Sequence, residues 1–295
     1  MASGIIIIDK PQDWTSQDVA ARLRRVFSTR RIGHGGTLDP MATGVLPVFV
    51  GRATRAVEFF DQAEKTYVAT LRLGQTTDTE DIWGRTLSES PVDVGPAEVE
   101  AVLRTFLGRQ QQTPPMYSAV KIGGKKLYEL ARQGKEIQRP SREIEIRQIE
   151  LLSHGDQDYV FRVTCSKGTY IRTLCKDIGQ ALGCGGTMAA LRRTRAGAYG
   201  IEDAIPLGEL LERSESGENV EHLLLPVDSM FRSDPAARLN ARQERLCRNG
   251  GSFPWTGESG RYRLYAPGGE FLALGSCENG VMKTVKSFFA LPEET

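Results

Sequence analysis

The sequence has few of the residues that bind metals or form disulfide bonds. Its 295 residues include three histidines, and its five cysteines are scattered, without any CxxC pair. An odd number of scattered cysteines is typical of reduced thiols in a cytosolic protein, and it argues against both a disulfide framework and a structural zinc site. We therefore expect a cytoplasmic protein without a bound metal.

Long apolar runs are also missing. The run GIIIID at residues 4–9 is far too short to cross a membrane and is typical of a buried strand. No charged region leads into a long apolar stretch at the start of the sequence, so we expect neither a signal peptide nor a membrane anchor. The length suits one large domain together with a small one.

Net charge is nearly absent, because 38 basic residues face 37 acidic ones. The charges are nevertheless segregated along the sequence. Residues 19–38 contain five basic and no acidic residues, residues 121–142 contain seven and two, and residues 162–195 contain seven and one. If these segments meet in space they form a surface for a polyanion, and otherwise they are three separate solvated faces. Charge alone favours neither interpretation.

Hydrophobic periodicity predicts a succession of strands and helices before a small β unit. Strands are expected at residues 4–9, 45–51, 65–74, 142–153 and 158–168. Helices are expected at residues 15–27, 96–108 and 169–183. Residues 76–91 read as an acidic loop, and residues 187–201 are expected to begin helical and end extended. From about Arg232, one helix precedes short strands with glycine turns, a pattern typical of a small barrel or sandwich.

The segment GHGGTLDPMATG, residues 33–44, surrounds a single carboxylate, Asp39, with glycines. It lacks the lysine of a GxxxxGK[ST] phosphate loop and does not fit GxGxxG, so it does not predict a nucleotide site. Aspartate before proline is a common turn residue, which is the simpler interpretation of Asp39 taken alone. The flanking glycines would, however, let a bulky ligand approach, and the loop lies between an arginine-bearing helix and a buried strand. This context favours a functional carboxylate.

Six segments in a fixed order carry a resemblance to a known family. They are DKP (9–11), GHGGTLDPMATGVLPV (33–48), KTYVATLRLGQTTDTED (65–81), PPMYSAVKIGGKKLYELAR (114–132), CSKGTYIRTLCKDIG (165–179) and LRRTRAG (191–197). In this order and spacing they resemble the TruB family of tRNA pseudouridine synthases, over most of residues 4–230. The resemblance implies an α/β protein of the α+β type, with a mixed, largely antiparallel central sheet flanked by helices. Residues 1–231 would form the catalytic domain and residues 232–295 a PUA-like RNA-binding β-barrel.

The resemblance also implies an activity. Uridine 55 in the T-arm of tRNA would be isomerised: the N1–C1′ bond breaks, the base turns, and it is rejoined through C5. The family uses no cofactor and no metal. The partner would be tRNA alone, with no membrane and no obligatory protein partner, and we expect a cytoplasmic monomer.

Three residues match the catalytic positions of the family. Asp39 matches the catalytic aspartate, which acts as a nucleophile or as a base that generates a glycal, and the sequence leaves both routes open. Arg172 matches the arginine that pairs with it, and a guanidinium stays charged beside a carboxylate. Tyr67 matches the tyrosine that stacks on the target base after that base leaves the folded RNA arm. Outside these motifs, Arg172 would read as a surface arginine and Tyr67 as a core residue.

Four residues match substrate-binding positions. His34 matches a histidine that holds the extruded base or replaces it in the stack, although a loop histidine can also simply cap a turn. Tyr170 and Leu191 match the lining of the uracil pocket, and either could equally be core. Asp81 matches a polar contact to the flipped nucleotide. Lys10–Pro11 match a motif that supports the active-site loop, and we interpret them as structural.

Two other functions and one other branch of the family compete with this interpretation. The guide-RNA-dependent branch shares the LDP motif but depends on protein partners, and activity on naked tRNA would separate it from the stand-alone type. A non-catalytic RNA-binding protein would not need Asp39. A glycosidase would need a clear second carboxylate at the site, which the motifs do not supply.

Overall fold

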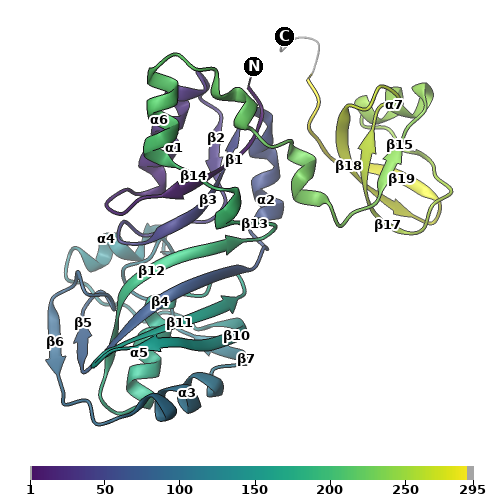
Figure 1. The fold of residues 1–295 in the computed structure, drawn as a ribbon. Coiled ribbons are helices and arrows are strands. Elements are labelled where there is room, and N and C mark those ends of the chain that lie inside the picture. Colours follow the sequence, from purple (N-terminus) through teal and green to yellow (C-terminus); the bar gives the residue numbers. More distant parts are fainter. Residues whose placement is uncertain (1, 291–295) are drawn as a thin grey trace.

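The computed structural model describes residues 2–290. Its fold is built on two main β-sheets (Figure 1). The larger sheet has ten strands: β1 (Gly4–Lys10), β2 (Ile32–His34), β3 (Thr43–Val50), β4 (Lys65–Leu73), β7 (Gly108–Gln112), β10 (Arg142–His154), β11 (Asp158–Cys165), β12 (Gly186–Ala196), β13 (Tyr199–Gly200) and β14 (Ile205–Pro206). The order is β14-β1-β3-β12-β4-β11-β10-β7, with β2 beside β3 and β13 beside β12. Only the β1–β14 and β3–β12 pairs are parallel. The predicted mixed, largely antiparallel sheet is therefore confirmed.

Helices pack on this sheet, and those expected at residues 15–27, 96–108 and 169–183 are all present, whereas the sequence analysis does not predict the helix at residues 207–215. The α-helices of the described residues are α1 (Ser16–Val26), α2 (Val57–Phe60), α3 (Pro96–Thr105), α4 (Leu127–Ala131), α5 (Ile171–Ala181), α6 (Leu207–Glu215) and α7 (Ala241–Arg248). Thr15 caps α1: its side chain accepts a bond from the Asp18 amide, and the Asp18 carboxylate accepts one from the Thr15 amide. This reciprocal cap satisfies two helix-end amides and explains why the helix begins there.

The first strand shows how the chain builds two cores at once. Side chains alternate across a strand, and all four isoleucines of β1 are buried. Ile6 and Ile8 belong to the core cluster that includes Val19 of α1, whereas Ile5 and Ile7 belong to a second cluster on the opposite face. An uninterrupted apolar run is what a strand covered on both faces requires.

Strand β12 corrects one expectation, because residues 187–201 do not begin as a helix. Gly186–Ala196 form a central strand that pairs with β4 along its length. Two irregularities in this pairing, between Met188 and Ala190 and between Arg193 and Arg195, shift the faces on which side chains lie. Because such bulges break the period of two, the segment does not show the alternation by which a strand is found in a sequence.

Residues 76–91 are also more ordered than the predicted acidic loop. Strands β5 (Gln75–Thr77) and β6 (Thr86–Glu89) pair as a hairpin, and all of this hairpin except Gln75 lies within these residues. All four residues of β6 are exposed, so no buried face marks it as a strand in the sequence. A second short hairpin pairs β8 (Lys121–Ile122) with β9 (Lys125–Lys126).

The smaller sheet follows in the last part of the chain, as predicted. It contains β15 (Ala236–Arg238), β16 (Phe253–Pro254), β17 (Gly260–Tyr265), β18 (Phe271–Glu278) and β19 (Val281–Ser287), in the order β15-β17-β18-β19-β16. The one helix that the sequence predicts here is α7, which packs against β18 and β19. Figure 1 shows this unit standing to one side of the larger sheet. Phe231 joins the two parts, because its ring contacts Phe59 on one side and Phe288 on the other.

The two halves of the larger sheet meet at a very short seam. Strands β3 and β12 pair only through Thr43 with Arg192 and Gly44 with Arg193. Gly44 has a φ of +101°, and a side chain there would overlap the backbone carbonyl oxygen of Arg193. Only glycine permits this approach. The seam brings the glycine-rich loop, which ends at Gly44, against the face of β12 and β4.

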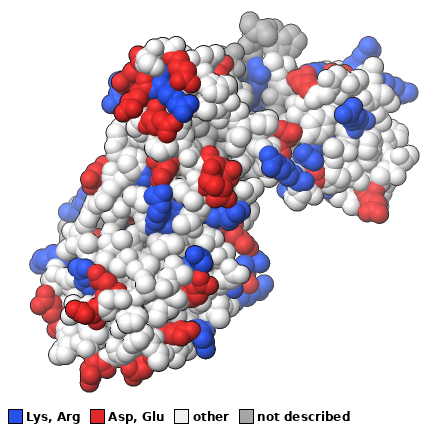
Figure 2. All heavy atoms as spheres, viewed as in Figure 1, with Lys and Arg blue, Asp and Glu red and all other residues white. Residues whose placement is uncertain are grey.

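Charges of both signs are mixed on the surface in view. On the face shown in Figure 2, lysines and arginines are interspersed with aspartates and glutamates. The three basic segments therefore form no continuous basic surface on this face. Within residues 2–290, no helix is both long and apolar enough to cross a membrane.

Candidate active site

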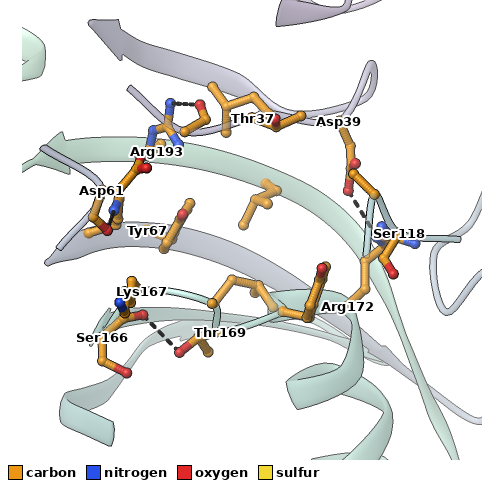
Figure 3. Close-up of a pocket in the computed structure, with 18 residues that line it drawn as sticks. Thr37, Asp39, Asp61, Tyr67, Ser118, Ser166, Lys167, Thr169, Arg172 and Arg193 are labelled. Atoms are coloured by element: carbon orange, nitrogen blue, oxygen red, sulfur yellow. Dashed lines mark hydrogen bonds and ion pairs between the residues drawn. The ribbon is translucent and has the colours of Figure 1, made fainter. Parts of the chain in front are cut away.

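A pocket of about 310 Å³ lies at the seam, between the glycine-rich loop and strands β4 and β12 (Figure 3). It is lined by Gly36–Asp39, Asp61, Lys65, Tyr67, Ser118, Ala119, Ser166–Arg172, Leu191 and Arg193. Five of the seven predicted site residues are in this lining: Asp39, Tyr67, Tyr170, Arg172 and Leu191. Segments far apart in the sequence thus converge on one cavity of a size suited to a single small group.

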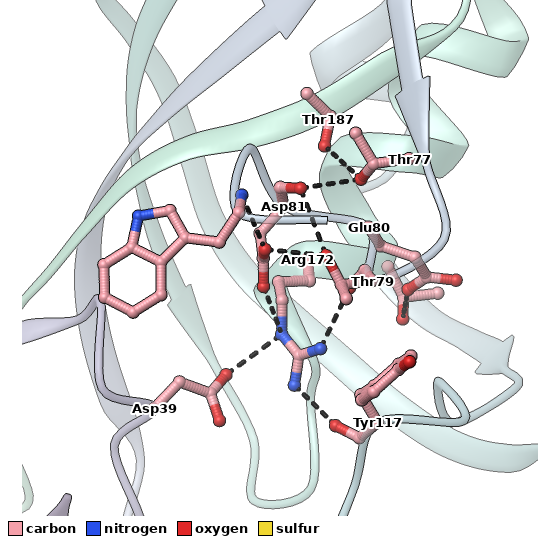
Figure 4. Close-up of polar contacts among 10 residues, drawn as sticks. Asp39, Thr77, Thr79, Glu80, Asp81, Tyr117, Arg172 and Thr187 are labelled. Atoms are coloured by element: carbon pink, nitrogen blue, oxygen red, sulfur yellow. Dashed lines mark hydrogen bonds and ion pairs between the residues drawn. The ribbon is translucent and has the colours of Figure 1, made fainter. Parts of the chain in front are cut away.

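Asp39 and Arg172 form the predicted ion pair. Arg172 Nε lies 2.9 Å from Asp39 Oδ2. The other two guanidinium nitrogens donate to the carbonyl oxygens of Thr79 at 3.0 Å and Tyr117 at 2.8 Å (Figure 4). The Arg172 side chain is only 5% exposed, whereas that of Asp39 is 39% exposed. A cation fixed on three sides therefore holds a carboxylate that remains open to the pocket.

Asp81 lies beside this pair but does not line the pocket. Its carboxylate is 3.8 Å from Arg172 Nε and accepts bonds from the Thr79 hydroxyl at 2.7 Å and the Trp83 amide at 3.1 Å. Burial raises the pKa of Asp81, while the Thr79 bond and the Arg172 charge oppose that rise. Asp81 is placed to hold Arg172, and its contact with a nucleotide stays a prediction.

Lys10 and Ser16 fix the loop that carries Asp39. Lys10 is fully buried, and its ammonium donates to the carbonyl oxygens of Pro11 at 2.8 Å, Trp14 at 2.6 Å and Pro40 at 3.4 Å. The Ser16 hydroxyl accepts from the Leu38 amide and donates to the Leu38 carbonyl. Burial lowers the pKa of Lys10 to about 8, although the nearby Asp39 charge opposes this. These contacts support a structural role for Lys10.

The glycines of the loop allow close packing within the protein and not the approach of a ligand. A side chain at Gly35 would strike the ring of Phe60, and one at Gly44 would strike the backbone of Arg193. We expected these glycines to let a bulky ligand approach Asp39. The close approach at Gly35 and Gly44 is instead between the loop and the protein itself, because the loop must seat tightly on β12 and α2 to place Asp39.

Tyr67 and Leu191 form the floor of the pocket. Each is 9% exposed, and Tyr67 lies across the β4–β12 ladder from Arg193. Burial raises the pKa of Tyr67, so its hydroxyl stays protonated. Tyr170 stands at the start of α5, where Gln112 accepts from its amide and donates to its carbonyl. These positions agree with an aromatic and apolar site for a base.

His34 is the second predicted residue, after Asp81, that does not line the pocket. It belongs to β2, and its Nε2 lies 3.1 Å from the side-chain nitrogen of Gln17. Burial, aided by the charge of Arg193, lowers the pKa of His34, so the ring is neutral at pH 7. Its role toward an extruded base stays a prediction.

Sequence reasoning missed three cations of the lining, Lys65, Lys167 and Arg193. All three belong to quoted motifs, KTY, CSKGTYIR and LRRTRAG, but the motifs alone do not tell which of two neighbouring residues faces the pocket. Arg192 points elsewhere and pairs with Asp9 at 2.7 Å. Arg193 is 1% exposed and faces the loop. In the described part of the chain, no group of three or more histidine, cysteine, aspartate or glutamate side chains could hold a metal ion.

Comparison with known sequences gives consistent matches over most of the chain. Residues 24–171 match the model for the TruB family pseudouridylate synthase N-terminal domain, and residues 172–232 match the tRNA pseudouridylate synthase B C-terminal domain. The tRNA pseudouridine synthase B of Syntrophomonas wolfei is 46% identical over 94% of each chain. That of Thermobifida fusca is 42% identical over 98% of this chain and 99% of its own.

Solved structures show the same fold. An H/ACA RNP bound to a substrate RNA containing 2′-deoxyuridine includes a chain with a TM-score of 0.74 and 26% identity, covering 97% of this chain and 85% of that one. A Cbf5-Nop10-Gar1 complex gives a TM-score of 0.74 at 28% identity, with the same coverage. The likeness extends past the larger sheet, since nearly the whole chain is covered.

Proposed function

The chain belongs to the TruB family of pseudouridylate synthases, and from this premise we propose that it isomerises uridine 55 in the T-arm of tRNA to pseudouridine. The observation that carries the proposal is the open carboxylate of Asp39, held by the buried Arg172 at the mouth of a base-sized pocket. The reaction needs one ionised group beside C1′ of the target, and the pocket offers that group on a rigid loop.

Asp39 is the central group of the proposed reaction. Its Oδ1 has no hydrogen-bond partner among residues 2–290, while Oδ2 is engaged by Arg172. A free carboxylate oxygen can attack C1′ as a nucleophile or remove a proton from the sugar to form a glycal. Arg172 sets the direction of the carboxylate and balances its charge in a site that closes over the base.

Tyr67, Leu191 and Tyr170 receive the base in this proposal. Removing a base from a folded arm costs a few kcal/mol, and stacking on an aromatic side chain returns roughly 1–3 kcal/mol. Tyr67 offers that platform from β4, with Leu191 beside it. His34 and Asp81 act outside this first contact: Asp81 steadies Arg172, and His34 contacts the RNA at the loop.

The proposal extends to the organisation of the chain. Residues 1–231 supply the chemistry, and residues 232–295 form a PUA-like unit that adds affinity for tRNA. We propose that the chain works in the cytoplasm as a monomer, on naked tRNA and without an obligatory protein partner. The curated relatives named tRNA pseudouridine synthase B support this choice over guide-RNA dependence, because their identity of 42–46% exceeds that of the chains from H/ACA complexes.

The test is to incubate the purified chain with an unmodified tRNA transcript and map pseudouridine by carbodiimide treatment and primer extension. We expect a single stop at position 55. A product that appears only with a guide RNA and accessory proteins would place the chain in the other branch. Tight tRNA binding without any product would favour a non-catalytic RNA-binding protein.

A further inference from the structure

The two ends of the pocket differ in their charge balance. At one end, Arg172 faces the carboxylates of Asp39 and Asp81. At the other end, Arg193 faces the cavity together with one acid, Asp61 (Figure 3). Lys65 also lines the pocket, and its ammonium donates to the Asp61 carbonyl at 3.5 Å. Within residues 2–290, no carboxylate oxygen lies within 4.0 Å of the charged nitrogens of Arg193 or Lys65. The second end therefore has buried positive charge without a paired anion.

Arg193 is held rigidly with one edge left over. Its Nε donates to the Val45 carbonyl at 2.6 Å, and its Nη2 donates to the Gly36 carbonyl at 3.1 Å. No carbonyl or carboxylate of the described residues accepts a bond from its Nη1, and the side-chain partner of the guanidinium is the Tyr67 hydroxyl in the pocket. This nitrogen lies next to Gly36, where an added Cβ would be 3.5 Å from it, and Gly36 lines the pocket. A planar guanidinium fixed at two nitrogens presents the third with little freedom to lose.

The positive charge of Arg193 acts on its buried neighbours. The pKa values of Lys65, Lys10 and His34 are all lowered first by burial and next, for Lys65 and His34, by the charge of Arg193. A cation in the protein interior is costly unless an anion or hydrogen bonds compensate it. Here two carbonyl oxygens and the neutral Tyr67 hydroxyl do so, without any paired carboxylate, and a negative charge arriving in the pocket would find a prepared site.

We propose that Arg193 is a further catalytic residue, which binds the negative charge that develops on uracil when its bond to C1′ breaks. The inference rests on the function proposed above. In both routes open to Asp39, N1 keeps the electron pair of the broken N1–C1′ bond, so the detached base is an anion with charge spread onto its carbonyl oxygens. When C5 bonds to C1′, the negative charge on the base disappears. C5 then gives up its proton to a base and N1 takes up a proton, and in the glycal route C2′ recovers its proton from Asp39. Product and substrate therefore contain the same atoms.

Position favours the base over an RNA phosphate as the ligand of Arg193. Arg193 is 1% exposed and lies on the floor beside Tyr67, the residue on which the base would stack. Phosphates follow the surface of a bound RNA, where the exposed Lys167 stands at the rim of the same pocket. Fixed donors aimed at developing charge are a large source of catalysis in sites that exclude water.

The test uses Arg193→Gln, with Arg195→Gln as a matched control. Arg195 belongs to the same strand, but it is half-exposed and pairs with Glu202. Single-turnover formation of the C-glycoside is measured at saturating enzyme on two tRNAs, one with uridine and one with 5-fluorouridine at the target. Fluorine makes the detached base a more stable anion, so it needs less help from a cation. Nucleosides are released by nuclease digestion and separated by chromatography.

We expect Arg193→Gln to slow the uridine substrate by about 10²–10³-fold and the 5-fluorouridine substrate by a factor at least tenfold smaller. Arg195→Gln should leave both rates unchanged. If Arg193→Gln does not fold, as judged by its melting curve, Arg193→Lys replaces it. That variant keeps the charge but loses the fork, and the same unequal slowing is expected.

Two results would overturn the inference. Equal slowing of both substrates would mean that Arg193 only fixes the loop through Gly36 and Val45. A raised Kd for tRNA with unchanged rates at saturation would mean a phosphate contact. A wild-type chain that forms no C-glycoside from either RNA would contradict the proposed function itself, and this outcome is visible in the same assay before any variant is compared.

Discussion

The two sheets of the molecule treat charge in opposite ways. The part built on the ten-stranded sheet buries Lys10, Lys65, Asp81, Arg172 and Arg193. In the described residues beyond 231, which include the five-stranded sheet, no charged side chain is buried. Its core is made of residues such as Leu264, Leu272 and Met282, whereas its arginines lie toward solvent or in surface ion pairs.

This contrast indicates which part of the molecule carries out the reaction. Burying a charge is unfavourable unless partners compensate it, so three buried cations that line one cavity, Lys65, Arg172 and Arg193, need an explanation other than stability. A unit that only binds RNA can keep its cations on the surface, where they meet phosphates without desolvation. Charge changes in the first part should therefore alter the rate of reaction, and those in the second part should alter affinity.

The sharpest test of this contrast is Asp39→Asn. The side chain keeps its volume, so the loop need not move, but the amide is neither a nucleophile nor a base. We expect the single-turnover rate to fall by at least about 10⁴-fold, while tRNA affinity by filter binding stays within a few-fold of wild type. A variant that melts and binds normally and turns over within tenfold of wild type would make Asp39 a simple turn residue.

Arg172→Lys should have the next largest effect. Lysine keeps the charge but cannot reach Asp39 and the carbonyl oxygens of Thr79 and Tyr117 at once. We expect a rate loss of about 10²-fold with unchanged tRNA affinity, measured in the same two assays. An affinity loss without a rate loss would place Arg172 among the RNA-binding cations and remove the distinction between the two parts.

The opposite pattern is expected for the double variant Arg242→Gln, Arg245→Gln. Both arginines lie exposed on α7. Arg238, four residues before Arg242, belongs to β15 and not to this helix. Point changes are preferable to truncation, because Phe231 and Phe288 share a core. Affinity should fall up to about tenfold, and the salt slope of binding should fall by about one for each phosphate that is no longer neutralised. The saturated rate should not change.

The smallest effect concerns the stability of the catalytic part. The pKa of Lys10 is lowered by burial to about 8 from an ordinary 10.5, so between these values the unfolded chain binds more protons and stability rises with pH. The wild type should gain about 1 kcal/mol over Lys10→Met between pH 8 and pH 9. Urea unfolding at both pH values measures this. If the stability difference between wild type and Lys10→Met does not change with pH, folding does not lower the pKa of Lys10.

Much of this arrangement can be predicted from the sequence, and the exceptions share a cause. Helix α1, strand β1 and the pairing of Asp39 with Arg172 are local patterns or motif matches, and the structure contains all three. Strand β12 is missed because its bulges conceal the alternation of a strand. Arg193 and Lys65 are missed as pocket residues because the same register decides which side chains face the cavity. Register depends on neighbours distant in sequence, which no local pattern records.

The seam at Gly44 has a consequence for how the sequence can change. The geometry of the cleft depends at this point on two backbones in contact, and the position that matters most there has no side chain to offer. In a saturation scan scored by product formation, Gly44 should accept as few substitutions as Asp39, although it contacts no substrate and takes part in no proton transfer. Intolerance to substitution at Gly44 would report how closely two backbones must approach. A list of catalytic residues drawn only from such a scan would include Gly44 by mistake.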